Sequence, residues 1–321
     1  MQTQVNSKLK PVVDVYEAQV QPRVRKLTSN PKFVKVKLFA QKHLATFARV
    51  LICWYFINLS VTNFNYWYKY NVPGVPWTAF PMFPCALFVL FNFKTHIFGS
   101  ILVLLAAKDA GHITYNQLYI WLVYKHDLYI NELMVKKLSM TGAMVMILVN
   151  DPFFKTAIDR TSKALSGLVL KDEPKYAISK KLSVILLIVR ILISSLFIFV
   201  GYGEIKRQIQ WSSGVVHHGH RHSRPKGDGH DQMWPKLAEF ALSLPFIVGF
   251  KTKAVSFALA TCLVLEALIY WNFWATLLGI GYSIHARDHF SVNIGVAGGL
   301  LLLQSFGGGK YSVDELLKKN D

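Results

Sequence analysis

Eight apolar blocks constrain this chain of 321 residues more than any other feature. Most contain the ~17–25 apolar residues that a helix needs to cross the hydrocarbon core of a membrane. They are residues 44–63, 76–93, 97–122, 133–149, 182–203, 233–250, 254–282 and 289–306. Hydrophobic residues make up 52% of the chain, which is too high for a soluble protein of this length. The sequence therefore predicts an all-α polytopic membrane protein with about eight transmembrane helices.

The positive charges lie mainly between these blocks and predict the orientation of the chain. A net charge of +18 would suggest nucleic-acid binding in a soluble protein, but the chain contains no RNA- or DNA-binding motif. We therefore expect no nucleic-acid partner. With both termini in the cytosol, 22 Lys and Arg residues lie on the cytosolic side and 8 on the lumenal side. This bias follows the positive-inside rule, and the basic lumenal loop 204–232 is tolerated because long loops translocate despite their charge.

The apolar blocks and charged segments divide the chain into five parts. We expect a cytosolic N-terminal segment, a first four-helix membrane unit, a cytosolic linker, a second four-helix unit with a His-rich lumenal loop, and a cytosolic tail. Their bounds are 1–43, 44–150, 151–181, 182–306 with the loop 204–232, and 307–321.

The two membrane units resemble each other in sequence. Residues 93–95 (FKT) recur as residues 250–252, an offset of 157. At the same offset Asp109 matches Glu266, Asn131 matches Asp288, and Gly142 matches Gly299. Residues 48–52 (ARVLI) resemble residues 189–193 (VRILI) at an offset of 141. The pattern predicts two tandem units in parallel orientation, since each has an even number of helices; chance similarity between apolar strings is the alternative.

Four charged residues fall within the apolar blocks: Arg49, Asp109, Arg190 and Glu266. Each costs roughly 2.5–3.5 kcal/mol on insertion scales unless it is paired or hydrated. One interpretation pairs Arg190 with Glu266 inside the second unit. The other pairs Lys108 locally with Asp109, while Arg190 extends to the headgroups or binds lipid. Structural roles are favoured over ligand binding or proton transfer.

A histidine cluster lies in the loop 216–231, VHHGHRHSRPKGDGHD. Imidazole groups bind Zn²⁺ or Cu²⁺ and respond to pH, so the metal candidates are His217, His218, His220 and His222. The low complexity of the segment favours a linker whose metal affinity is incidental, and we expect neither a metal nor a cofactor. No phosphate-binding loop, nucleophile elbow or zinc-protease motif occurs, so no catalytic residue is assigned and an enzyme is not expected.

The chain ends in Lys318-Lys319-Asn320-Asp321. Lysines three and four residues from a free C-terminus form the dilysine pattern, an address that returns membrane proteins from the Golgi to the endoplasmic reticulum. It is read only in the cytosol, which agrees with the predicted orientation. The preceding residues 307–309 (GGG) predict a flexible exit from the last span. A solvated basic tail is the alternative.

These C-terminal residues resemble the surfeit-locus-protein-four family of endoplasmic reticulum cargo receptors. The resemblance rests on residues 294–303 (IGVAGGLLLL), 307–309, 312–315 (SVDE), the dilysine end, 248–253 (VGFKTK) and 272–274 (NFW). Residues 48–49 and 133–149 are similar more distantly. The family pattern has an acidic pair in the first span after the matching arginine, which residues 56–60 (FINLS) lack.

The resemblance implies a receptor that binds soluble secretory cargo in the lumen, enters COPII vesicles and returns by COPI. Its partners would be cargo proteins, both coats and membrane lipids. It would reside in the endoplasmic reticulum membrane and cycle through the intermediate compartment and Golgi. The alternative is a membrane transporter or lipid-handling protein of the early secretory pathway. A transporter should have a cavity that reaches Asp109 or Glu266, whereas a receptor should have a lumenal groove and sealed spans.

Overall fold

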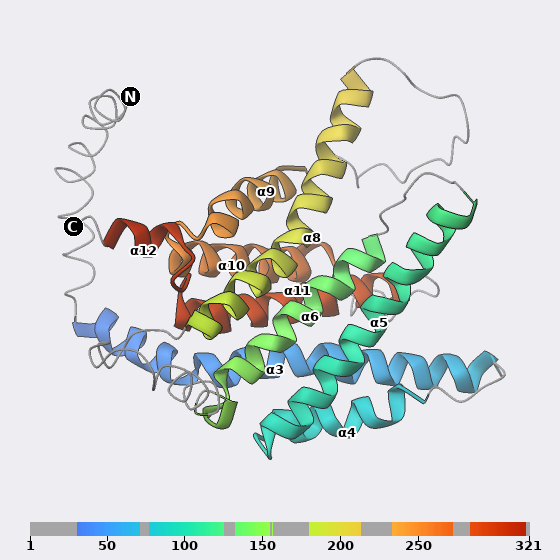
Figure 1. Cartoon of the computed structure of the whole chain (residues 1–321), viewed down its shortest axis with the longest axis horizontal. Coiled ribbons are helices and arrows are strands. Elements are labelled where there is room, and N and C mark those ends of the chain that lie inside the picture. The colour runs from blue at the N-terminus through green and yellow to red at the C-terminus, as the bar shows by residue number, and fades with distance from the viewer. Residues whose placement is uncertain are drawn as a thin grey trace, which may run out of the picture. The chain divides into compact units, whose positions relative to one another are not determined.

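The apolar blocks form α-helices in the computed structural model, which describes residues 31–70, 77–124, 132–154, 156, 180–212, 233–271 and 283–318. The helices are α3 (Pro31–Tyr70), α4 (Ala79–Leu90), α5 (Thr95–Tyr124), α6 (Glu132–Asn150), α8 (Lys180–Ser212), α9 (Met233–Val248), α10 (Thr252–Tyr270), α11 (Ser283–Phe306) and α12 (Val313–Lys318) (Figure 1). No strand occurs in these ranges. The chain divides into residues 1–46 and 47–321, and the first part contributes helical residues 31–46.

Five helices are long and apolar enough to span a membrane. Within the described ranges these are His43–Lys69, Thr95–Val123, Lys181–Lys206, Thr252–Tyr270 and Ala286–Phe306. They coincide with the first, third, fifth, seventh and eighth predicted blocks. The predicted fold class, an all-helical polytopic membrane protein, is thus confirmed for the described residues.

Three predicted spans form helices that are too short or too polar to meet this criterion of length and apolar composition. Helix α4 has 12 residues and α9 has 16, so at ~1.5 Å per residue both are shorter than the ~30 Å hydrocarbon core. Helix α6 has 19 residues but contains Glu132, Lys136 and Lys137, which lower its hydropathy. The seventh block was predicted too long, because α10 ends at Tyr270 and Trp271 is not helical.

Helices that follow one another along the chain pack together, and α6 and α11 join the two halves. Helix α4 packs on α5 and α5 on α6; α8 packs on α9, α9 on α10, and α10 on α11. Helix α6 also contacts α8 and α11. Helix α3 reaches α11 through a hydrogen bond of 2.8 Å from Asn58 Nδ2 to Ser291 Oγ and one of 2.9 Å from Arg287 Nη2 to Thr62 Oγ1.

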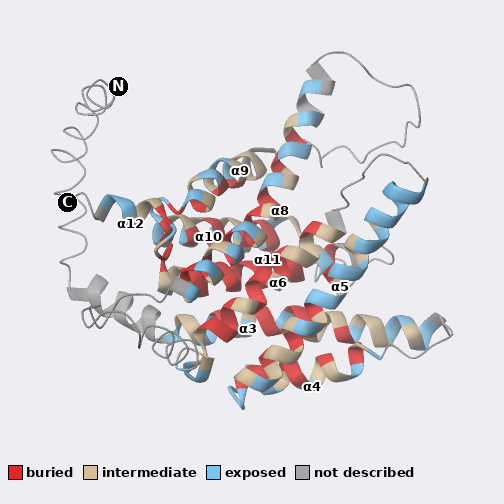
Figure 2. Ribbon diagram, viewed as in Figure 1, coloured by how far each residue is buried: buried red, intermediate tan, exposed pale blue. Residues whose placement is uncertain are grey.

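The core lies along α6 and α11. Residues 291–300 of α11 are all buried, and so are most residues of α6 from Ser139 onward (Figure 2). A helix buried on every side must let its neighbours approach closely, and small residues permit this. A Cβ atom added at Gly299 would lie 2.5 Å from Ala143 Cβ, so α6 and α11 touch through these two positions. Gly299 therefore serves the close packing of the two helices.

The turns between α4 and α5 and between α9 and α10 have the same backbone conformation. Asn92 and Lys94 have φ angles of 59° and 40°, and Gly249 and Lys251, exactly 157 residues later, have 76° and 45°. Phe93 N donates to Phe88 O at 2.8 Å, and its counterpart Phe250 N donates to Pro245 O at 2.9 Å. The two turns are geometrically equivalent.

A second correspondence links α3 with α8. A Cβ at Gly142 would meet Leu192 Cβ at 2.9 Å and Ile193 Cγ1 at 3.3 Å. A Cβ at Gly298 would meet Leu51 Cβ at 3.1 Å and Ile52 Cγ1 at 2.8 Å. Leu51 and Ile52 lie 141 positions before Leu192 and Ile193. By these contacts Gly142 corresponds to Gly298, not to Gly299 as the sequence offset indicated. Helices α6 and α11 are therefore related by an offset of 156.

Candidate functional site

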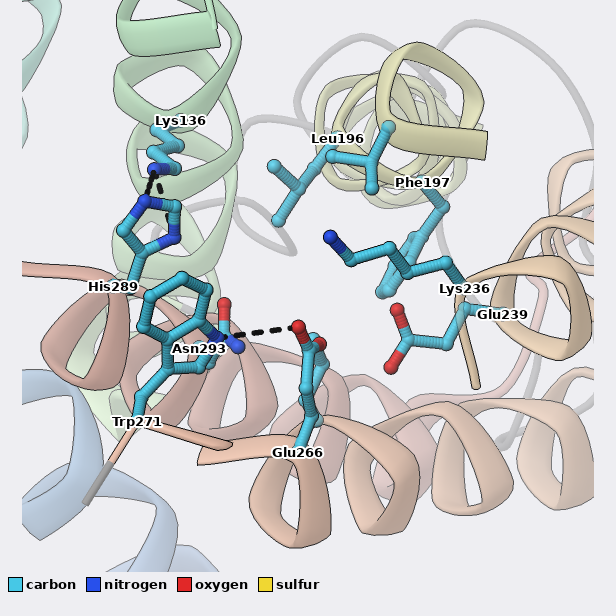
Figure 3. A pocket seen from close by; sticks show the side chains of 11 residues that line it. Lys136, Leu196, Phe197, Lys236, Glu239, Glu266, Trp271, His289 and Asn293 are labelled. Atoms are coloured by element: carbon cyan, nitrogen blue, oxygen red, sulfur yellow. Dashed lines mark hydrogen bonds between the residues drawn. The ribbon is translucent and has the colours of Figure 1, made fainter. Parts of the chain in front are cut away.

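A small pocket lies at the end of the bundle where α10 ends and α6, α9 and α11 begin, which we call the pocket end. Its volume is about 40 Å³. It is lined by Lys136 of α6, Leu196, Phe197 and Val200 of α8, Lys236 and Glu239 of α9, Leu263 and Glu266 of α10, Trp271, and His289 and Asn293 of α11 (Figure 3). One wall is apolar and the other is polar and charged, as in sites that hold a ligand's stem and fix its polar end.

Two buried glutamates face each other in this pocket. Glu239 is 4% exposed and Glu266 is 9% exposed, and their carboxylates point toward one another (Figure 3). Glu266 accepts a hydrogen bond of 3.3 Å from Trp271 Nε1 and a further one from Asn293. Glu239 hydrogen-bonds with Glu266, but its Oε1 is buried and has no hydrogen-bond partner among the described residues. Buried polar atoms are normally paired, so this oxygen marks an incomplete site.

The basic side of the pocket is organised by His289. Its ring stacks on Trp271 with a centroid distance of 4.0 Å and an interplanar angle of 9°. Lys136 Nζ lies 3.0 Å from its Nε2 and 3.1 Å from its Nδ1. A neutral imidazole has one acceptor nitrogen, and the lysine ammonium donates to it. Trp271 therefore couples the glutamate side of the pocket to the lysine–histidine side.

Arg190 and Glu266 do not pair, so that interpretation of the sequence is wrong. Arg190 is fully buried at the opposite end, where α9 ends and α10 begins, which we call the tail end. Its Nη2 donates to Tyr311 O at 2.6 Å, and the carboxylate of Asp314 acts on its charge. Packing separates the two residues because they lie near opposite ends of α8 and α10.

Asp109 also has a partner other than the expected one. Its Oδ2 lies 3.3 Å from Lys137 Nζ of α6, rather than pairing with the adjacent Lys108. Lys137 additionally hydrogen-bonds with Tyr55 of α3. Arg49 is half-buried, and the nearest carboxylate acting on it is Asp151. The sequence thus identified the charged positions but not their partners.

The tail returns to the bundle instead of leaving it. Gly307 and Gly309 have φ angles of 77° and 71°, and a Cβ at Gly308 would lie 2.5 Å from Ser312 Cβ. The three glycines form a tight turn, so the predicted flexible exit is wrong. Asp314 then accepts hydrogen bonds from the backbone nitrogens of Lys251 and Thr252 at the start of α10.

Other sequence candidates lie partly or wholly outside the described residues. Lys318 is the last residue of α12, and Lys319 lies beyond it. The histidine loop, with His217, His218, His220 and His222, lies outside the described ranges. Sequence reasoning missed the pocket residues Glu239, Lys136, His289 and Asn293. A comparison of the two halves at the offset of 157 would have identified Glu239, because the equivalent residue of the first half is the apolar Met82 and the acidic side chain occurs only in the second half.

Comparison with known proteins gives one finding, in the second half of the chain. The SURF4 family model matches residues 232–320. No curated protein and no solved structure matches the chain. The matched stretch contains α9 to α12, hence both pocket glutamates and the docked tail. This match agrees with the resemblance found in the sequence and supports membership of the chain in the Surfeit locus protein 4 family, a membrane-trafficking family of the early secretory pathway.

Proposed function

We propose that the protein is a cargo receptor that binds soluble secretory proteins in the lumen of the endoplasmic reticulum. It enters COPII vesicles with them and returns from the Golgi by COPI. The observation that carries the proposal is the family match over residues 232–320, which includes the pocket-lining helices α9–α11 and the tail. No catalytic residue is part of it.

Within this proposal the pocket end faces the lumen and the tail end faces the cytosol. The support is the distribution of Lys and Arg, with 22 on the proposed cytosolic side and 8 on the lumenal side. Lys94, Lys251 and Lys253 lie at the turns that this orientation places in the cytosol. A glycosylation site inserted in 204–232 should then be glycosylated, and one inserted in 155–175 should not. The reverse result would invert the orientation.

We further propose eight transmembrane helices in two tandem four-helix units, α3–α6 within 44–150 and α8–α11 within 182–306. The equivalent turns at Lys94 and Lys251 and the equivalent glycine contacts at Gly142 and Gly298 support a duplicated unit. Sites in duplicated membrane proteins favour the interface between repeats. The pocket fits this expectation because α6 of the first unit contributes Lys136 to it.

The tail completes the proposal as a retrieval signal read by coatomer through Lys318 and Lys319. The segment 1–43 and the linker 151–181 would lie in the cytosol, and the histidine loop would act as a lumenal linker. Deleting 216–231 should then leave abundance and residence unchanged. A loss of cargo export that follows zinc depletion or lumenal pH would instead make the loop a sensor.

The experiment that tests the receptor role measures secretion in cells that lack the protein. We expect a subset of soluble secretory proteins to leave the endoplasmic reticulum more slowly, while a membrane cargo with its own export signal leaves at the normal rate. Proximity labelling from a lumenal loop should recover the same soluble proteins. Normal secretion of every labelled protein would refute the proposal.

A transporter is the second candidate, because the pocket does reach Glu266. Its volume of about 40 Å³ holds only a few water-sized groups, and Asp109 is occupied by Lys137. Purified protein in liposomes discriminates the two functions. Transport predicts solute or proton flux that Glu266→Gln abolishes, whereas a receptor should show no flux above that of empty liposomes.

A further inference from the structure

Asp109 and Glu266 occupy equivalent positions in the two halves, and their surroundings differ in two respects. In the first half, the negative charge of Asp109 is neutralised by Lys137 at 3.3 Å. Lys137 is held by Asp109 of α5 and by Tyr55 of α3. That half therefore contains a complete carboxylate–ammonium site, built entirely from its own side chains.

In the second half the ammonium is missing. At the offset of 156 set by the packing of Gly142 and Gly298, the position of Lys137 is taken by Asn293. Asn293 contacts Glu266 as Lys137 contacts Asp109, which supports the correspondence independently. The second half therefore has an uncharged amide where the first half has an ammonium group.

A second carboxylate has been added at the same place. Glu239 lies 157 residues after Met82, so an apolar side chain of the first half is replaced by an acid. Glu239 is more than nine-tenths buried, and its carboxyl group points into the pocket (Figure 3). It hydrogen-bonds with Glu266, while its Oε1 has no partner among the described residues. Two carboxylates buried side by side are costly unless they share a proton or meet a cation, and a positively charged ligand would stabilise both in the ionised form.

The lysines that line the pocket do not replace the missing ammonium. Lys136 Nζ lies against the ring of His289. The charge of Lys236 acts on both glutamates and that of Lys136 acts on Glu266, but no ion pair within 4.0 Å joins Lys236 to either glutamate among the described contacts. Figure 3 shows the ammonium group of Lys236 extending into the pocket, so this lysine competes with a cationic ligand for the two glutamates.

We propose that the pocket binds the terminal ammonium group of an alkyl chain, as in a lysine side chain, between Glu239 and Glu266, with the rest of the chain extending out of the cavity of about 40 Å³. The ammonium takes the place that Lys137 holds in the other half. Its three donors match Glu239 Oε1, the Glu266 carboxylate and the Asn293 amide oxygen. Leu196, Phe197 and Leu263 provide an apolar wall for the methylene groups. This assignment concerns the pocket alone and stands independently of the receptor role.

The test uses the purified full-length protein in detergent or nanodiscs, with N-acetyl-lysine-N-methylamide as the probe. The matched control is N-acetyl-norleucine-N-methylamide, which has a similar chain without the ammonium group, plus sodium chloride to equal ionic strength. We expect the lysine probe to raise the melting temperature and to give saturable binding in calorimetry. Equal stabilisation by the norleucine control, or by sodium chloride alone, would refute an ammonium site.

Variants locate the effect in the pocket. Asn293→Lys supplies an internal ammonium and should abolish the response to the probe, while Asn293→Gln should retain it. Glu239→Met restores the residue of the first half and should weaken binding by about 10- to 100-fold, the loss expected for one charged hydrogen bond. Lys236→Met should strengthen binding. An undiminished response in Glu239→Met would place the probe elsewhere and overturn the proposal, even if Asn293→Lys fails to fold.

Discussion

At the scale of single residues, Gly249 and Arg190 depend on each other at the tail end. Gly249 has a φ of 76°, in the left-handed region that residues with a Cβ rarely adopt. A Cβ at this position would overlap Arg190 Nη1 and would lie 2.5 Å from Ser312 Cβ. The glycine is therefore required both by the turn and by the buried guanidinium, whose only described hydrogen bond goes to Tyr311 O.

We predict that Gly249→Ala destabilises the protein by more than about 1 kcal/mol, because an alanine at positive φ is strained and the guanidinium must move. Gly111→Ala is the matched control, since nothing lies within 4 Å of a Cβ there and the site is helical. Alanine in a helix is favoured over glycine by ~0.5–1 kcal/mol. Thermal unfolding in detergent should show a lower midpoint for Gly249→Ala only; equal midpoints would contradict the packing at Arg190.

The ion pair between Lys137 and Asp109 should appear as a coupling between mutations. Both side chains are partly exposed, at 15% and 28%, so the cost of breaking the pair lies between the ~1 kcal/mol of surface pairs and the ~3–5 kcal/mol of buried ones. Lys137→Leu and Asp109→Leu should each lower the melting temperature, and the double variant should recover part of the loss. Additive losses would mean that the two charges do not interact.

At the scale of helices, length and burial decided what the sequence could predict. The long apolar helices α5, α8 and α11 were found from composition alone, because each can satisfy its own backbone in lipid. The end of α10 was missed because the apolar block continues past Tyr270 into aromatic residues that give no stop signal. The partners of the buried charges were missed because Asp109 and Lys137 are 28 residues apart, and only packing brings them together.

The side chain of Asp314 helps to fix helix α12 to the bundle. Asp314 caps the first residues of α10, where it accepts a hydrogen bond of 2.8 Å from Thr252 N, and its own nitrogen donates to Gly249 O at 3.1 Å. The first backbone nitrogens of a helix have no partner within the helix, so a carboxylate from another segment completes them. The same carboxylate also acts on Arg190. One residue thus links α10, α8 and the tail.

Asp314→Ala should release the tail at a cost of about 0.5–2 kcal/mol, the usual range for the loss of a helix cap. Hydrogen exchange should accelerate in residues 307–318 and at the start of α10, and not in α5. Asp314→Asn retains an oxygen that can cap and is the matched control. Unchanged exchange in Asp314→Ala would show that the glycine turn alone holds the tail.

At the scale of the whole molecule, the docked tail changes how the dilysine pattern is presented. The sequence alone indicated a flexible exit, but residues 307–317 are folded against the tail end and only residues 319–321 lie beyond the described helix. Lys318 is therefore the last residue of α12, a helix whose Asp314 accepts a hydrogen bond from the backbone of Lys251. In the proposed topology this end faces the cytosol, where coatomer would read both lysines and the terminal carboxylate.

We predict that Lys318→Ser combined with Lys319→Ser moves the protein forward to the Golgi and slows the export of its cargo. A receptor site built for two ammonium groups and a carboxylate leaves its own charged groups unpaired when these are missing, and this costs ~1–3 kcal/mol for each buried group. Coatomer binding to the protein should fall, and so should the steady-state fraction in the endoplasmic reticulum. Replacing the same lysines with Arg separates general basicity from recognition of the ammonium groups. The Asp314→Ala variant should still be retrieved, because its lysines remain and its tail is only released. If the double serine variant stays in the endoplasmic reticulum and exports cargo normally, the tail is no more than a basic end and the cycling part of the proposed function is wrong.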